Sequence, residues 1–219
     1  MIIPSTMTDD EIRSYILNDY RELFSLIKKD KNDFRRKVLK EAKNFPYRRV
    51  YKHTSRRNID YKIVFIADKR GCHDNPKYTP VAIYNAYEGK YMAMIGVGIV
   101  QLFPPHFFKR YRERIIKNND ISTEELMEHF LSYCDDGVTW SYIDEERKPM
   151  YRCIAEIEME DEWNMVGVSD NYCVFGVQKK DLIVCKTIIS NDLIKEDQKK
   201  HFEFLREENK LSMECYYKR

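Results

Sequence analysis

The chain has 219 residues, of which 43% are hydrophobic and 13% aromatic, with a formal net charge of +2 at pH 7. This composition can build a packed core, which excludes global disorder, and no apolar run reaches the roughly 18 residues that a membrane span needs. Because the N-terminus also lacks a basic segment followed by an apolar stretch, we expect a cytoplasmic protein that does not enter the membrane.

Residues 8 to 44 have the pattern of two helices. Thr8 and Glu11 have capping-box spacing at the start of the first helix, and apolar residues from Ile12 to Ile27 form a stripe. The second helix is predicted over Asp33 to Lys43, ahead of a proline at position 46 that ends helical order. We therefore expect an N-terminal helical section over residues 1–46.

A basic tract overlaps this section. Residues 28–57 contain thirteen Lys or Arg and three acidic residues, a net charge of +10. Such tracts attract polyanions and bind phosphates, although the same charges can simply solvate helices. The candidate nucleic-acid-binding residues are Arg35, Arg36, Arg48, Arg49, Lys52, Arg56 and Arg57.

Residues 47 to about 100 are strand-like. Strands are predicted over 61–67, 80–87 and 91–97, where β-branched and aromatic residues are frequent, and Gly89 marks a hairpin turn. The segment from Asp68 to Pro76 contains His and Cys, but its glycine and proline favour a turn-rich connection over a metal site.

The run that begins at His106 is the clearest chemical signal in the sequence. After Pro104 and Pro105 open a helix, His106, Arg110 and Arg114 fall at roughly 0°, 40° and 80° around it. The apolar residues of the same run lie on another side and are predicted to face the core: Phe107, Phe108, Tyr111 and Ile115. Imidazole and guanidinium groups on one side of a helix are suited to phosphate chemistry, although a charged outer helix face explains them equally well.

A second central helix is predicted from Ser122 to about Tyr133, again with capping-box spacing at its start. Five strands follow over 138–143, 151–158, 163–168, 172–177 and 182–189, and a closing helix over about 191–209 uses Leu193, Ile194, Phe202, Phe204 and Leu205. The predicted fold is α+β: a mainly antiparallel sheet with two central helices, an N-terminal helical section and a C-terminal helix. Residues 47–219 would form the α+β domain, unless the whole chain is one continuous domain.

The segment Pro104–Tyr133 resembles metal-independent RNase toxins of the barnase, EndoU, colicin and RelE-like superfamily. The resemblance rests on His106, Arg110 and Arg114 spaced by four residues and followed by a second, acid-started helix. It covers about 30 residues of the chain, and the strand-rich segment ahead of the helices departs from the family pattern. The resemblance implies a late-strand Lys, Thr or Tyr in the site, and Lys186 and Thr187 occupy that position.

If the resemblance holds, the protein cleaves RNA phosphodiester bonds. His106 would move the proton of the 2′-hydroxyl, because histidine titrates near neutral pH, and Arg110 and Arg114 would stabilise the charged transition state. Lys186 or Thr187 would protonate or position the leaving oxygen. This scheme needs no metal and no cofactor.

Three classes of function remain open from the sequence. The first is a metal-independent endoribonuclease-like protein of toxin or mobile-element type, and the second is a non-catalytic nucleic-acid-binding protein. The third is a protein-interaction or structural module without enzymatic activity. The expected partner is RNA or another polyanion in the first two classes and a protein in the third.

Overall fold

The computed structural model describes residues 2–3, 6–96, 98–133, 138–147, 151, 162–169 and 171–217. The fold is α+β with a mainly antiparallel sheet, which confirms the predicted class. The chain divides into two compact units, Met1–Leu102 and Phe103–Arg219. The predicted boundary at residue 46 stays a prediction, and each unit is described by itself.

The first unit begins with two helices, α1 (Asp9–Arg21) and α2 (Phe24–Lys40). The predicted capping box at the start of α1 is confirmed: the Glu11 amide donates to the Thr8 hydroxyl at 3.3 Å, and the Thr8 amide donates to the Glu11 carboxylate at 2.8 Å. Because this box satisfies amides that would otherwise lack partners, it fixes where α1 starts.

The break between the two helices lies earlier than the sequence pattern predicts. The helices separate at Glu22 and Leu23, and α2 then continues without interruption through Asp30 and Asn32. Ile27, Asp30 and Phe34 are all buried on its inner side. The apolar residues before and after Asp30 therefore belong to one helix, α2. Asp30 does not end this helix, because it is paired with His53.

The strands of the first unit follow the order β2-β3-β4-β5-β6, with bounds Tyr47–Thr54, Asp60–Ala67, Lys77–Ala86, Gly89–Ile95 and Val100–Phe103. The last residue of β6, Phe103, belongs to the second unit. The pairs from β2 to β5 are antiparallel, while the short β1 (Ile2–Ile3) runs parallel to β4. The strands predicted over 61–67, 80–87 and 91–97 correspond to β3, β4 and β5. A short 3₁₀ turn, η1 (Arg70–His73), lies in the predicted turn-rich connection.

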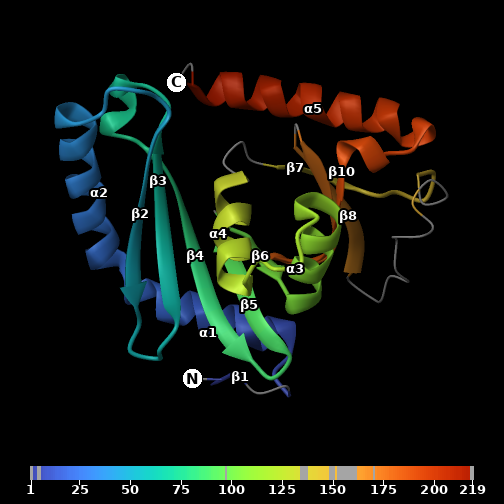
Figure 1. Ribbon diagram of the computed structural model, residues 1–219, viewed down its shortest axis with the longest axis horizontal. Coiled ribbons are helices and arrows are strands. Elements are labelled where there is room, and N and C mark those ends of the chain that lie inside the picture. Colours follow the sequence, from blue (N-terminus) through green and yellow to red (C-terminus); the bar gives the residue numbers. More distant parts are fainter. Residues whose placement is uncertain are drawn as a thin grey trace. The chain divides into compact units, whose positions relative to one another are not determined.

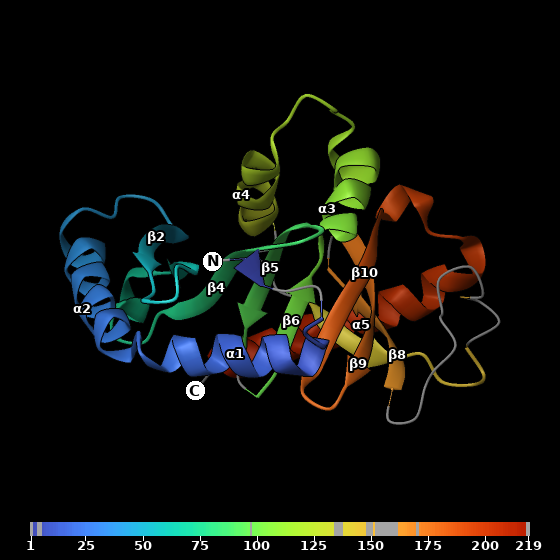
Figure 2. The same ribbon diagram turned by 90° about the horizontal axis from the view of Figure 1, so that it is seen from below.

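Helices α1 and α2 cover one face of this sheet (Figure 1, Figure 2). The Tyr61 hydroxyl of β3 donates to the Ile16 carbonyl of α1 at 3.2 Å, and the rings of Phe34 on α2 and Phe65 on β3 stack 5.4 Å apart. Phe34, Tyr61 and Phe65 are almost fully buried, so this helix-on-sheet layer forms the core that holds α2 in place.

The second unit opens with α3 (Pro105–Tyr111), a π-helical turn η2 (Arg112–Ile116) and α4 (Thr123–Tyr133). The predicted capping box before α4 is confirmed, because the Glu125 amide donates to the Ser122 hydroxyl and the Ser122 amide donates to the Glu125 carboxylate. Buried aromatic rings join these helices around Phe130, whose ring contacts those of Phe103, Phe107, Phe108, Tyr111 and Tyr172.

The strands of the second unit follow the antiparallel order β10-β9-β8-β7, with bounds Leu182–Ser190, Tyr172–Lys179, Glu162–Val168 and Thr139–Tyr142. These correspond to four of the five predicted strands. The fifth, over 151–158, lies outside the described residues except for Tyr151.

The closing helix is shorter at its start and longer at its end than predicted. A 3₁₀ turn, η4 (Asn191–Leu193), precedes α5 (Glu196–Tyr217). Ile194, Phe202 and Leu205 belong to the core of the unit, as expected. Leu193 and Phe204 are each 53% exposed, so their predicted core role is wrong: Leu193 lies in the 3₁₀ turn before α5, and Phe204 lies about 200° around α5 from the buried Phe202. None of the helices in the described part of the chain has the length and apolar character of a membrane span.

Candidate functional site

The inner side of α2 is joined to β2 by polar contacts. Asp30 and His53 are both largely buried, and the Asp30 carboxylate lies 2.5 Å from His53 Nε2. Since a buried carboxylate is costly without a partner, this contact accounts for an acidic residue on the packed side of the helix. Asp30 therefore adds little to the exposed charge of α2.

The second acidic residue of α2, Asp33, also has side-chain partners. The Tyr51 hydroxyl donates to Asp33 Oδ2 at 2.8 Å, and Lys37 Nζ lies 2.6 Å from the same oxygen. Hydrogen bonds from Lys37 and then from Tyr51 hold the pKa of Asp33 below its ordinary value. Burial, together with the carboxylate of Asp33, raises the pKa of Tyr51. Both acids of α2 are thus paired near β2.

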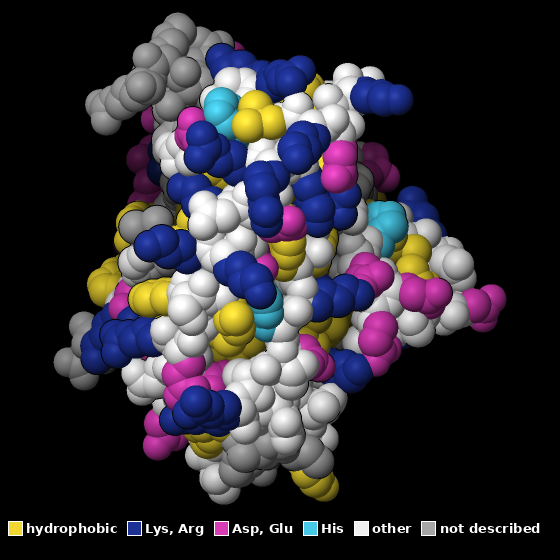
Figure 3. All heavy atoms as spheres, turned by 90° about the vertical axis from the view of Figure 1, so that its left-hand side faces the viewer, with side chains coloured by type: hydrophobic (Ala, Val, Ile, Leu, Met, Phe, Trp, Pro, Cys, Tyr) yellow, Lys and Arg dark blue, Asp and Glu magenta, His cyan; other side chains and the backbone are white. Residues whose placement is uncertain are grey.

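The outward side of α2 carries only cations among its charged residues. Five exposed Lys or Arg lie along it, whereas neither acidic residue of the helix is exposed: Lys28, Lys29, Arg35, Arg36 and Lys40. Figure 3 shows Lys and Arg side chains gathered on the face of the molecule that carries α2. We call these five residues the α2 basic face.

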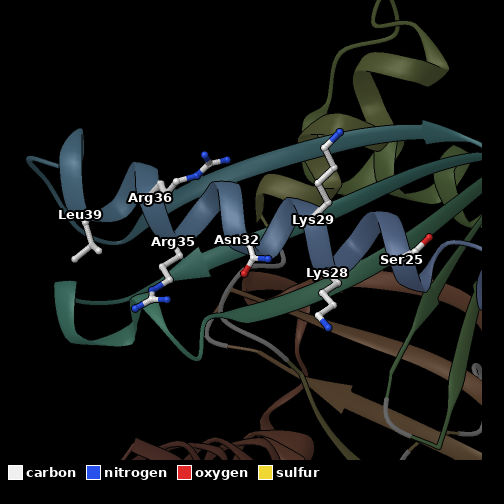
Figure 4. Close-up of a pocket in the computed structure, with 7 residues that line it drawn as sticks. All are labelled: Ser25, Lys28, Lys29, Asn32, Arg35, Arg36 and Leu39. Atoms are coloured by element: carbon white, nitrogen blue, oxygen red, sulfur yellow. The ribbon is translucent and has the colours of Figure 1, made fainter.

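A hollow of about 710 Å³ lies along this face. It is lined by side chains of α2 alone: Ser25, Lys28, Lys29, Asn32, Arg35, Arg36 and Leu39. Lys29 and Arg36 point to one side of the helix, and Lys28 and Arg35 point to the other (Figure 4). The hollow is therefore flanked by positive charge on both sides.

The cations of this face differ in how strongly they are engaged. Arg35 Nε lies 2.7 Å from Asp74 Oδ1, and Arg36 Nη2 lies 3.5 Å from Asp33 Oδ1. Both arginines are more than half exposed, so these contacts contribute about 0–1 kcal/mol and exchange readily for a phosphate. Lys28, Lys29 and Lys40 form no ion pair with any residue that the structure describes.

The structure brings together only some of the basic residues proposed from the sequence. Arg35 and Arg36 belong to the α2 basic face, but Arg49 faces inward from β2. Its guanidinium donates to the Tyr47 hydroxyl at 2.9 Å and to Glu41 at 3.0 Å. Arg49 is therefore part of the packing between β2 and the end of α2.

The remaining basic candidates lie elsewhere in the first unit. The Arg57 guanidinium stacks 4.7 Å from the Tyr15 ring centre and lies 3.9 Å from the buried Asp19 carboxylate. Arg48 and Lys52 lie on the opposite face of β2 from Arg49. Arg56 is exposed in the turn before β3. The tract is thus divided over several surfaces.

Lys28, Lys29 and Lys40 lie in the basic tract predicted over residues 28–57 but were not among its named binding candidates. The signal was present in the spacing, because Ile27, Asp30, Phe34 and Val38 recur on one side of a helix while these lysines fall on the opposite side. The predicted start of the second helix at Asp33 concealed it by dividing this pattern.

In the second unit, the helix of His106 does not keep α-helical geometry throughout. It changes at Arg112 to the π turn η2, in which the Lys117 amide donates to the Arg112 carbonyl at 2.8 Å. A π turn takes in an extra residue, so the α-helical angles from which the stripe of His106, Arg110 and Arg114 was predicted do not apply from Arg112 onward. As predicted, Phe107, Phe108 and Tyr111 are buried, whereas Ile115 is only half-buried.

Arg114 and Thr187, both proposed as catalytic residues, are in contact. Arg114 Nη1 donates to Thr187 Oγ1 at 2.9 Å and to the Ile188 carbonyl at 3.2 Å. Lys186 lies immediately before Thr187, at a β-bulge where the pairing of β10 with β9 skips one residue. A π turn and a β-bulge therefore meet at this contact, and both irregularities are common beside functional sites.

The other two proposed catalytic residues are exposed on α3. Arg110 Nη1 lies 3.0 Å from Glu113 Oε2 in a pair that is about half exposed on each side. His106 is exposed in the first turn of the helix. Arg110 is thus balanced by a neighbouring carboxylate, whereas Arg114 is held against β10. Among the described residues, no group of three or more His, Cys, Asp or Glu is arranged to hold a metal ion.

No protein-family model matches this sequence, and neither a curated protein nor a solved structure is significantly similar to it.

Proposed function

We propose that this protein binds the phosphate backbone of nucleic acid through the α2 basic face. The observation that carries the proposal is the distribution of charge around α2. Asp30 and Asp33 are paired near β2, while the exposed charged residues of the helix are all positive. Phosphates that replace the counterions of such a face release those ions, and this release is the main source of affinity for nucleic acid.

A solvated helix without a ligand is the alternative explanation for these charges. Such helices usually alternate Lys or Arg with Glu at spacings of three or four residues, which stabilises them. The α2 basic face has no exposed acid of its own, and Arg36 and Lys40 are like charges four residues apart. The repulsion between Arg36 and Lys40, which the pairs of Asp33 with Arg36 and Lys37 offset only in part, favours a polyanionic partner.

Charge reversal tests the proposal. We expect the parent protein to bind fluorescently labelled nucleic acid in an anisotropy titration, with an affinity that falls linearly on a log–log plot against salt concentration. The double variant Lys28→Glu/Lys29→Glu should bind more weakly and reduce the salt slope by about 2.

The matched control reverses two exposed lysines, Lys195 directly before α5 and Lys200 within it, in the variant Lys195→Glu/Lys200→Glu. It changes the net charge by the same amount and should retain the parent salt slope. Equal losses in both double variants would mean that only the overall charge matters, and the α2 basic face would no longer be the binding site. Absence of binding by the parent protein would refute the function itself.

RNA cleavage is the second candidate function, and the contact between Arg114 and Thr187 favours it. This contact joins two segments that the RNase resemblance assigns to one site, beside the bulge at Lys186. In this scheme His106 transfers the proton of the 2′-hydroxyl, and Arg110 and Arg114 stabilise the charged phosphorane-like transition state. Arg114 uses one nitrogen for the contact with β10, which leaves further donors for a phosphate.

Cleavage is tested by incubating purified protein with end-labelled RNA, with and without EDTA. Shortened products that persist in EDTA and disappear in His106→Ala and Arg110→Ala are expected for this scheme. Lys109→Ala serves as the control, because Lys109 is an exposed cation of the same helix with no assigned role. Cleavage at the parent rate in His106→Ala and Arg110→Ala would exclude these catalytic roles.

A further inference from the structure

The outward side of α2 has an uncharged central stripe between two rows of cations. At 100° per residue, Lys28 and Arg35 lie about 40° and 60° to one side of Asn32, and Arg36 and Lys29 lie about 40° and 60° to the other. Figure 4 shows the same division of the four cations. The remaining residues of the hollow, Ser25 and Leu39, lie within about 20° of Asn32.

This pattern matches the layout of a duplex groove, which has base edges at its floor and phosphates along both walls. An α-helix with side chains is about 10–12 Å across, and the major groove of B-form DNA is about 12 Å wide. From Lys28 to Arg35 the rise is about 10.5 Å, so each row of cations follows a wall of the groove for about three base pairs. The packed inner side of α2 lies opposite Asn32 and does not compete with the groove.

From this geometry we infer that α2 enters the major groove of B-form DNA, with Asn32 facing the base edges. The inference rests on the proposed function and specifies which form of nucleic acid binds to the α2 basic face. An asparagine amide can pair with both N6 and N7 of adenine, and the Leu39 side chain can contact a thymine methyl group. Asn32 and Leu39 are exposed and therefore open to such contacts.

Two other forms of nucleic acid fit this surface less well. The major groove of A-form RNA is deep and narrow and does not admit a helix. Single strands are bound mainly by stacking of bases on aromatic rings, and the seven residues that line the hollow include no aromatic residue. A rigid helix with two rows of cations is therefore better matched to a B-form duplex.

The test compares binding of the full chain to duplex DNA, duplex RNA and single strands of one sequence and equal length at one salt concentration. We expect duplex DNA to bind at least about tenfold more tightly than the other forms, with Lys28→Glu/Lys29→Glu weakening every form. Duplex sequences selected from a random pool should contain adenine at a fixed position. Asn32→Ala should reduce the preference for that sequence over a scrambled duplex by about tenfold or more, whereas Asn75→Ala, at an exposed turn, should not.

The outcomes separate this inference from the proposed function. Equal or tighter binding of duplex RNA or of single strands, still weakened by Lys28→Glu/Lys29→Glu, would retain backbone binding and overturn entry into the major groove. A preference for duplex DNA whose sequence selectivity is unchanged in Asn32→Ala would overturn the role of Asn32. Failure of the parent protein to bind any form would overturn the proposed function together with the inference.

Discussion

Arg114 on the π turn η2 donates a hydrogen bond to the hydroxyl of Thr187 on β10 at 2.9 Å, across 73 positions of sequence. The same nitrogen donates to the Ile188 carbonyl, so the contact involves both a side chain and the backbone of the strand. It lies directly after the β-bulge, and it fixes the end of the helical segment to the strand. The contact therefore stabilises the second unit whether or not this region is catalytic.

Thr187→Val removes the hydroxyl acceptor while retaining the branched shape of the side chain. We expect the free energy of unfolding to fall by about 1–2 kcal/mol, because the charged Arg114 guanidinium loses the hydroxyl that accepts its hydrogen bond. Urea unfolding measures the change. Thr139→Val on β7 is the control, since no hydrogen bond of the Thr139 hydroxyl to a described residue is present, and it should stay within about 0.5 kcal/mol of the parent. A similar loss in the two variants would argue against the contact.

Gly176 on β9 lies opposite the bulge and has no room for a side chain. A Cβ atom at this position would be 2.6 Å from the Val184 carbonyl oxygen, a backbone atom that cannot rotate away. We therefore expect Gly176→Ala to destabilise the protein by about 1–3 kcal/mol in urea unfolding. Gly71→Ala is the matched control, because no atom lies within 4 Å of its added Cβ. An unchanged stability of Gly176→Ala would show that the two strands separate easily here.

Asp33 and Tyr51 are predicted to be energetically coupled. Asp33→Ala and Tyr51→Phe each remove one partner of the same hydrogen bond, so the double variant should be less destabilised than the sum of the single variants, by about 0.5–3 kcal/mol. Because the folded-state pKa of Asp33 is lowered, its contribution is present above the ordinary carboxyl pKa of about 3.9 and is lost as the pH falls through the lower folded value. Urea unfolding at neutral and acidic pH measures both effects, and additivity at neutral pH would contradict the coupling.

His201 on α5 is expected to make stability depend on pH. Burial, and then the positive charge of Arg147, lowers its pKa below 6.5, with the carboxylate of Asp144 opposing the shift. The unfolded chain therefore binds the proton more readily, so stability is full above about pH 6.5 and declines as the pH falls toward the lower folded value. Unfolding titrations in this interval should show a smaller decline for His201→Asn, which can retain a polar contact with the Tyr151 hydroxyl. An identical decline in parent and variant would assign the pH dependence to other groups.

Local signals in the sequence were sufficient to predict most of the secondary structure. Capping boxes at Thr8 and Ser122 identified two helix starts, and runs rich in β-branched and aromatic residues identified β3, β4 and β5. The position of the break before α2 could not be obtained in this way. Asp30 is tolerated on the buried side of the helix because it pairs with His53, which lies 23 residues away in the sequence. A single-sequence pattern carries no information on such distant pairs.

The candidate sites were predictable to a lesser degree. Positive charge between residues 28 and 57 was evident, but only the folded chain separates the outward Lys28 and Arg35 from the inward Arg49. Likewise, the sequence placed Arg114 on an α-helix, whereas its contact with β10 coincides with a π turn. Both differences arise from contacts between segments that are far apart in the sequence.

The inward pairing of Asp30 and Asp33 also affects how this protein can change by mutation. The residues that hold α2 on the sheet and the residues that face outward are separate sets on opposite sides of one helix. Substitution at Lys28, Asn32 or Arg35 therefore alters what α2 presents to a ligand with little effect on folding. Ligand preference on this helix can diverge through single codon changes while the scaffold beneath it stays the same, which makes α2 a suitable segment for randomised libraries.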